Sequence, residues 1–241
     1  IFLNDGNGGI STQIAYTAGN NPTSIDAGDI DNDGTIDLVV TNGGDDAFFL
    51  LLNDGGDVSN MSQQIPIATG DLPVDAVFTN IDDDGDNDIV VACYGEEDIL
   101  PNGSIPGELR FYEVSPSLRV SISLVGFLAV EKPKDINPGD VNNDKDFHLS
   151  VSLKAAGIVA LLRRVAPAKG FDWGVVQRIE VGANPSSISL GDLDNDGDAD
   201  AIVANEGSNT ISILQMGATN VYENELVIEV GDNPSSVELL D

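Results

Sequence analysis

Short apolar runs rich in Val, Ile and Leu alternate along this chain with turns rich in Gly, Asn and Asp. The clearest runs are residues 38–40, 47–52, 89–91, 108–114, 175–181, 201–203 and 210–214. Runs of this length, bounded by turn residues, predict β-strands. No stretch repeats its apolar residues convincingly at helical spacing. We therefore expect an all-β protein.

Proline sets the register of an internal repeat. Pro22, Pro73, Pro133, Pro185 and Pro234 stand 51, 60, 52 and 49 residues apart, and each interval holds four predicted strands. A four-stranded unit that recurs at about 50 residues is typical of a β-propeller blade. We expect one propeller, or a segment of one, over residues 1–241. Its units are 22–72, 73–132, 133–184 and 185–233, with partial units at 1–21 and 234–241.

A nine-residue acidic motif begins seven residues after each of the first four prolines. Carboxylate or amide oxygens occupy its positions 1, 3 and 5, and Gly occupies position 6 in three copies. This spacing wraps oxygen ligands around Ca²⁺, with a sharp turn at position 6 and a backbone carbonyl at position 7. The predicted metal positions in the three intact copies are Asp29, Asp31, Asp33, Thr35 and Asp37; Asn80, Asp82, Asp84, Asp86 and Asp88; and Asp192, Asp194, Asp196, Asp198 and Asp200.

Other proteins that use a similar acidic loop fit this chain less well. An EF-hand requires a bidentate Glu at position 12, where this chain has Val40, Val91, Val151 and Val203. A calcium β-roll repeats every nine residues rather than every fifty. Mg²⁺-assisted phosphoryl transfer is a weaker reading, because a catalytic site is usually built once in a chain.

The third copy of the motif departs from the pattern. Lys145 stands at position 6 and His148 at position 9. Lys lacks the conformational freedom of Gly, and His removes a hard oxygen ligand. We expect a weak or lost metal site there, in which the Lys145 ammonium partly neutralises nearby carboxylates. Its residues are Asp140, Asn142, Asp144, Asp146 and His148.

The stretch from Asn184 to Leu214, which contains the fourth motif, resembles an FG-GAP/VCBS-type repeat. That family includes the calcium-binding blades of integrin α-subunit propellers and many bacterial surface proteins. The resemblance implies that each loop joins the first two strands of a blade, and that a complete propeller usually has seven blades. It implies either a part of a larger propeller or a small ring that is closed by both chain ends.

The chain carries 41 acidic and 10 basic residues, a formal net charge of −31. Seventeen of the acids lie in the four motifs, where bound cations would neutralise part of the charge. The remaining excess disfavours nucleic acid and anionic membrane surfaces. No apolar stretch reaches 18 residues, so no membrane insertion is expected. Cys93 is the only cysteine, and we expect it to be a small core residue.

All ten Lys and Arg residues lie between Arg110 and Arg178. One reading is that these bases offset the acidic surroundings. The other is a contact face, including Arg163, Arg164 and Lys169, through which the chain self-associates head to tail. Trp173 would anchor a contact or pack between blades.

No nucleophile and base occur together, because Cys93 and His148, the only His, lie in different units. We therefore expect no enzyme activity. The predicted function is an extracellular or cell-surface binding module, stabilised by Ca²⁺, for a protein or glycan partner. Its turns at 42–46 and 205–209 and its insertion at 94–107 are candidate contact loops. A structural subunit of an extracellular fibre or surface layer, and an accessory propeller of a polysaccharide-active enzyme, are the alternatives.

Overall fold

The computed structural model describes residues 1–239 except 54, 64–65, 96–106, 116–120 and 166–171. All nineteen elements in these residues are strands, so the prediction of an all-β fold is confirmed. Among the described residues, no helix has the length and apolar character that crossing a bilayer requires.

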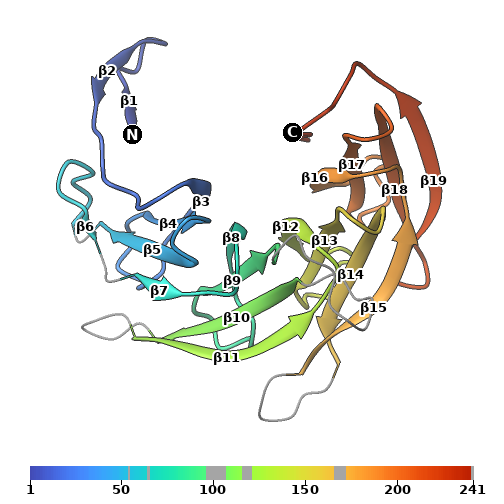
Figure 1. Ribbon diagram of the computed structural model, residues 1–241, viewed down its shortest axis with the longest axis horizontal. Coiled ribbons are helices and arrows are strands. Elements are labelled where there is room, and N and C mark those ends of the chain that lie inside the picture. The colour runs from blue at the N-terminus through green and yellow to red at the C-terminus, as the bar shows by residue number, and fades with distance from the viewer. Residues whose placement is uncertain (54, 64–65, 96–106, 116–120, 166–171, 240–241) are drawn as a thin grey trace.

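Four antiparallel sheets follow one another along an open arc, like the blades of a propeller (Figure 1). In each blade the four strands occur in sequence order from the inside of the arc to the outside. The strands of blade 1 are β3 (Pro22–Gly28), β4 (Asp37–Asn42), β5 (Ala47–Leu52) and β6 (Ser62–Gln63), with β7 (Ile67–Ala68) also pairing with β5. Blade 2 has β8 (Pro73–Thr79), β9 (Asp88–Cys93), β10 (Glu108–Ser115) and β11 (Ser121–Ala129).

Blade 3 consists of β12 (Pro133–Gly139), β13 (His148–Leu153), β14 (Ile158–Arg164) and β15 (Trp173–Glu180). Blade 4 consists of β16 (Pro185–Gly191), β17 (Asp200–Asn205), β18 (Thr210–Gly217) and β19 (Val221–Glu229). A hairpin of β1 (Phe2–Asn4) and β2 (Ile10–Gln13) stands at one end of the arc, and the C-terminal segment lies at the other (Figure 1). The described strands form propeller-like blades and do not close a ring.

Most of the core lies between consecutive blades, and a smaller cluster of Val40, Leu51 and Met61 lies on blade 1. The second strand of each blade is almost completely buried and rich in Val and Ile, as at Val90, Val91 and Val203. One apolar cluster joins blades 1 and 2, a second joins blades 2 and 3, and a third joins blades 3 and 4. The blades therefore hold together by burying apolar faces against each other.

A ladder of polar contacts runs along the innermost strands. The third residue of each inner strand reaches the next blade: Asp75 Oδ2 accepts a hydrogen bond of 2.9 Å from Ile136 N, and Asp135 Oδ2 accepts one of 2.7 Å from Ile188 N. Ser187 Oγ accepts one of 3.4 Å from Val237 N, so the C-terminal segment follows the same pattern. These bonds fix the register of one blade against the next.

Asp75 and Asp135 also face each other at the junction of blades 2 and 3, where they share a hydrogen bond. Both side chains line a cavity of about 540 Å³ on the inside of the arc. Burial, and then repulsion from Asp135, raise the pKa of Asp75 to about 8. Burial raises the pKa of Asp135 as well. The pair therefore retains a proton at neutral pH, because two adjacent buried carboxyls cannot easily both ionise.

The Asp75 carboxyl should make the stability depend on pH. In the unfolded chain it ionises near its usual pKa of 3.8, whereas the folded chain keeps it protonated up to about pH 8. The folded state binds the extra proton between these values, so this group lowers the free energy of unfolding as pH rises from 4 to 8, by at most about 1.4 kcal/mol per pH unit. Urea unfolding of Asp75→Asn should show a shallower decline over that range than the wild type.

The matched control is Asp71→Asn, which removes one exposed carboxylate and should keep the wild-type slope. Parallel slopes for Asp75→Asn and wild type would contradict the buried protonated pair.

Candidate metal centres

The four acidic loops all connect the first and second strands of their blades, between β3 and β4, β8 and β9, β12 and β13, and β16 and β17. This placement agrees with the family resemblance. Their backbones follow the same course. Position 4 is left-handed in every loop, with φ between 54° and 64°, and so is position 6, with φ of 88°, 96°, 74° and 98°. Position 6 is Gly in three loops because Gly adopts this conformation without steric cost. In the third loop Lys145 adopts it instead.

Loop 1 holds its carboxylates together through backbone amides. Asp29 accepts hydrogen bonds from Asp33 N at 3.1 Å and Gly34 N at 2.9 Å, and Asp31 accepts one from Asp33 N at 3.2 Å. Carboxylate oxygens of Asp29, Asp31 and Asp33 lie within 4.8 Å of one another. Burial, and then repulsion from neighbouring carboxylates, raise the pKa of Asp31. Such a cluster of like charges favours a cation at its centre.

Loop 4 has the same arrangement. Asp192 accepts hydrogen bonds from Asn195 N at 2.7 Å, Asp196 N at 3.2 Å and Gly197 N at 3.0 Å. Oxygens of Asp192, Asp194 and Asp200 lie within 4.8 Å of one another. Every side-chain donor in this group is a carboxylate oxygen, the ligand type that Ca²⁺ prefers.

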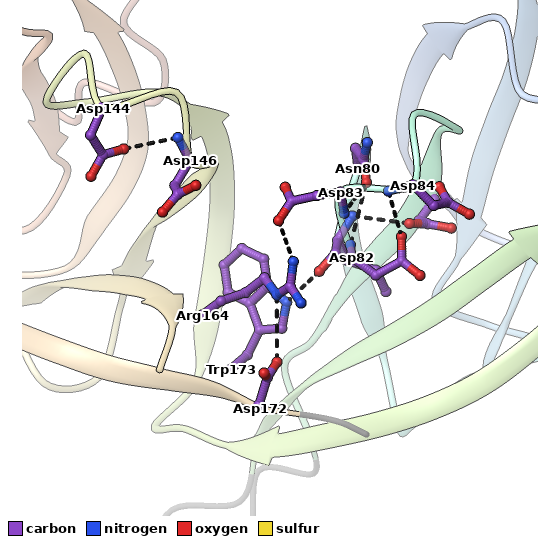
Figure 2. A network of polar contacts seen from close by, with 11 residues as sticks. Asn80, Asp82, Asp83, Asp84, Asp144, Asp146, Arg164, Asp172 and Trp173 are labelled. Atoms are coloured by element: carbon purple, nitrogen blue, oxygen red, sulfur yellow. Dashed lines mark hydrogen bonds and ion pairs between the residues drawn. The ribbon is translucent and has the colours of Figure 1, made fainter. Parts of the chain in front are cut away.

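Loop 2 begins with Asn80, whose Oδ1 accepts a hydrogen bond of 2.7 Å from Asp83 N. The adjoining blade contributes a cation here, because Arg164 forms ion pairs with Asp83 and with Asp172 (Figure 2). The Arg164 charge also opposes the rise that burial causes in the pKa of Asp82. Loop 2 thus combines a neutral first position with a nearby guanidinium, and its net charge is less negative than the acidic residues alone suggest.

The Asp at position 9 has a second role that the motif did not reveal. Asp37, Asp88 and Asp200 are each only 1% exposed. In each, one oxygen accepts a hydrogen bond from the amide of position 2 in its own loop, at 2.9–3.0 Å. The other accepts one from an amide at the end of the third strand, at 2.8–2.9 Å. These carboxylates therefore fasten the loop to the third strand even without a metal ion.

The remaining predicted ligands lie on the same loops. Thr35 Oγ1 lies 2.5 Å from Asp33 Oδ1 and also contacts the carbonyl oxygen of Asn53, so its single hydroxyl proton is shared between two acceptors. Asp84 and Asp196 accept hydrogen bonds of 2.9 Å from the amides of Asp86 and Asp198. Position 7 therefore turns its amide toward the loop interior.

Blade 3 does not expose all of the predicted basic face. Arg163 is exposed, whereas Arg164 is held by its two ion pairs, and Lys169 lies outside the described residues. Lys154 and Arg178 also pair with acids outside blade 3, Glu206 and Glu131. These contacts match the reading in which the bases offset acidic surroundings.

Trp173 packs between blades 2 and 3. It is 6% exposed, its ring centroid lies 5.6 Å from that of Phe111, and its Nε1–H donates to Ile81 O at 3.0 Å (Figure 2).

Cys93 is fully buried, and burial raises the pKa of its thiol to about 12, in keeping with a core residue. Most of the predicted insertion, residues 96–106, lies outside the described part of the chain.

Comparison with known proteins identifies the repeats. Residues 1–40 and 29–91 match the model of the FG-GAP-like repeat family. The chain thus contains FG-GAP-like repeats in residues 1–91, and the prediction of this repeat family is confirmed; integrin-like is a more specific label than the match carries. No curated protein matches the chain significantly.

Several solved structures share the fold at low sequence identity. A protein from Lactobacillus plantarum is 18% identical with a TM-score of 0.66, and the match covers 97% of this chain and 65% of that one. A proposed 6-phosphogluconolactonase from Bacteroides fragilis is 17% identical with a TM-score of 0.61, and the match covers 91% of this chain and 58% of that one. The periplasmic gluconolactonase of Pseudomonas aeruginosa is 16% identical with a TM-score of 0.58, and the match covers 85% of this chain and 53% of that one. The chain spans less than two thirds of the length of each.

The expectation that this chain is not an enzyme is contradicted by these matches. Two proteins with the same fold carry lactonase names, so this fold supports catalysis. That expectation rested on the lack of a nucleophile beside a His, and it did not include the carboxyl pair Asp75 and Asp135. The signal was present, because both residues stand two positions after the repeat proline, where Ser24 and Ser187 stand in the other blades. A pair that holds one proton beside an open cavity can exchange it with a bound molecule.

The two roles of loop carboxylates can be separated by mutation. Asp200→Asn should lower the free energy of unfolding by about 2–3 kcal/mol with or without calcium, because it weakens buried charge-assisted hydrogen bonds. Asp194→Asn, at the exposed third position of the same loop, should leave stability in chelator nearly unchanged. Thermal unfolding of both variants in chelator and in millimolar calcium measures the difference. Equal losses in chelator would contradict a structural role specific to position 9.

Proposed function

We propose that this chain is a calcium-stabilised, propeller-like binding module whose loops 1, 2 and 4 each hold one Ca²⁺. The observation that carries this proposal is the preformed arrangement of loops 1 and 4, whose carboxylate oxygens converge within 4.8 Å at equivalent places in their blades. Loop 2 keeps the same backbone course and donor spacing with Asn80 at its first position.

The donor set favours Ca²⁺ over other common ions. Ca²⁺ takes six to eight oxygen ligands with flexible geometry, whereas Mg²⁺ demands a nearly ideal octahedron. An irregular loop of Asp and Asn side chains, with carbonyl groups nearby, suits the first requirement. Sites on exposed loops of this kind need plentiful calcium, so we propose an extracellular or cell-surface location.

The cavity beside loop 2 is the surface that we assign to a partner. It measures about 550 Å³ and lies between blades 2 and 3. Phe147 and Val165, which are 40% and 58% exposed, line it together with the exposed Arg163. Apolar side chains beside a guanidinium suit a protein or glycan that offers an apolar face and an acceptor group. A calcium ion in loop 2 would hold one wall of this cavity in place.

Calcium titration tests the metal part of the proposal. The chelator-treated chain should bind three Ca²⁺ in isothermal titration calorimetry, and Asp31→Ala should bind two. Each ion that binds only the folded chain adds about 2.7 kcal/mol of stability at a calcium concentration one hundred times its Kd. Chelator should therefore lower the Tm. Asp71→Ala, which removes an exposed carboxylate outside the loops, should keep all three ions. A wild-type chain that binds no calcium at millimolar supply would overturn the proposal.

A glycan array probed with the labelled chain tests the binding part. Binding should require calcium and should weaken about tenfold in Phe147→Ala, as expected when a central apolar contact is lost. Sedimentation in calcium distinguishes the structural-subunit alternative, in which the chain self-associates and Arg163→Glu reduces its mass. If the chain neither bound to the array nor self-associated, the module proposal would lose its support. That outcome would favour the accessory propeller of a polysaccharide-active enzyme.

A further inference from the structure

Loop 3 departs from its three counterparts in a way that changes which metal ion it suits. One ligand atom from each of Asp140, Asp144 and His148 lies within 4.8 Å of the other two. The loop therefore retains a convergent donor group although it has lost the calcium pattern. The group differs from those of loops 1 and 4 because an imidazole nitrogen replaces a carboxylate oxygen.

The loop 3 backbone still holds its acidic donors in place. Asp140 accepts hydrogen bonds from Asp144 N at 3.1 Å and from Lys145 N at 2.8 Å. Asn142 Nδ2 donates to Asp144 Oδ2 at 2.8 Å. Asp140 thus sits as Asp29 does in loop 1, with its two oxygens held by the amides of positions 5 and 6.

A buried oxygen in the same loop has no partner. Asn142 Oδ1 is inaccessible to solvent and accepts no hydrogen bond from the described residues. Asn142 stands at position 3, where loops 1 and 4 place a converging carboxylate. A buried acceptor that lacks a donor is costly, and coordination to a cation would satisfy it.

His148 is positioned as a metal-binding histidine. It is 1% exposed, and its Nδ1 lies 3.1 Å from the carbonyl oxygen of Asp146. Metal-bound histidines usually donate the N–H of one ring nitrogen to a carbonyl or carboxylate, which leaves the other nitrogen free to bind the ion. If Nδ1–H donates to Asp146 O, Nε2 carries the lone pair.

The charge of loop 3 disfavours calcium. Affinity for Ca²⁺ rises with the number of charged ligands, and this motif holds three carboxylates where loop 4 holds five. An imidazole, in contrast, adds affinity for Zn²⁺, Co²⁺ and Ni²⁺.

We propose that loop 3 binds a divalent first-row transition-metal ion of the Zn²⁺ class through His148, Asp140, Asp144 and Asn142 Oδ1. Zn–N and Zn–O bonds of about 2.0–2.2 Å place neighbouring ligands about 3.3 Å apart, a spacing compatible with donors that lie within 4.8 Å of one another. Cys93 does not compete for the ion, because its thiol is fully buried in the core between blades 1 and 2. The site is independent of calcium binding in loops 1, 2 and 4.

Zinc titration of the untagged chain in saturating calcium tests this site. One Zn²⁺ equivalent should bind with a Kd in the micromolar range or below. Because His148 is the only histidine, its proton resonances should shift in step with that equivalent. Co²⁺ should give a visible absorption band that Zn²⁺ displaces.

Variants in loop 3 distinguish zinc binding by its donor group from zinc binding elsewhere on the acidic surface. His148→Asp should weaken zinc binding at least tenfold and add one calcium equivalent, since the other loops accommodate a buried Asp at this position. Asp144→Asn, an exposed change that leaves the fold intact, should weaken zinc binding as well. Asp146→Asn is the matched control and should keep the zinc equivalent, because the donor group does not include its carboxylate.

Two outcomes would overturn the proposal. One is a folded wild-type chain that binds no zinc at hundred-micromolar supply. The other is zinc binding that persists unchanged in both His148→Asp and Asp144→Asn, which would place the ion elsewhere on the acidic surface. Failure of calcium binding with zinc binding intact would refute the calcium module and leave this site standing.

Discussion

The repeated carboxylate at position 9 of the acidic loops is the interaction on which blades 1, 2 and 4 depend. Asp37, Asp88 and Asp200 each join three parts of one blade through backbone amides, and each is almost completely buried. A buried charge is stable only when its oxygens are satisfied. The tight shape of the loop and the pairing of the blade's strands are therefore linked, and that same shape brings the remaining carboxylates close together.

The proposed metal ion would thus be added to a loop that already has its shape. The left-handed residues at positions 4 and 6, and the amides turned toward position 1, arrange the oxygens without an ion. If an ion binds as we propose, its energetic role would be to offset repulsion within a dense group of negative charges. This view explains how blade 3 keeps the blade fold while its loop departs from the pattern, since His148 is buried at the same position without using the two backbone amides.

The sequence predicted most of the architecture because its signals are local. Strand length, the proline register and the loop spacing all lie within single units, and they placed four strands per blade and one loop after each first strand correctly. What the sequence could not reveal depends on contacts between units. The pairing of Arg164 with Asp83 joins residues 81 positions apart, and that of Asp75 with Asp135 joins neighbouring inner strands. Lys145 and His148 were visible as departures, yet only the three-dimensional arrangement shows that His148 converges with two carboxylates.

The unequal polar contacts between blades bear on how a chain of similar repeats avoids assembling in the wrong order. The third residue of the inner strand is Ser in blades 1 and 4, at Ser24 and Ser187, and Asp in blades 2 and 3, at Asp75 and Asp135. A blade displaced by one place would bring an unsuitable partner to a buried carboxyl, and the mismatch would cost more than a shifted apolar contact. The correct order of these similar repeats thus depends on a few polar side chains whose hydrogen bonds connect one blade to the next rather than strands within one blade.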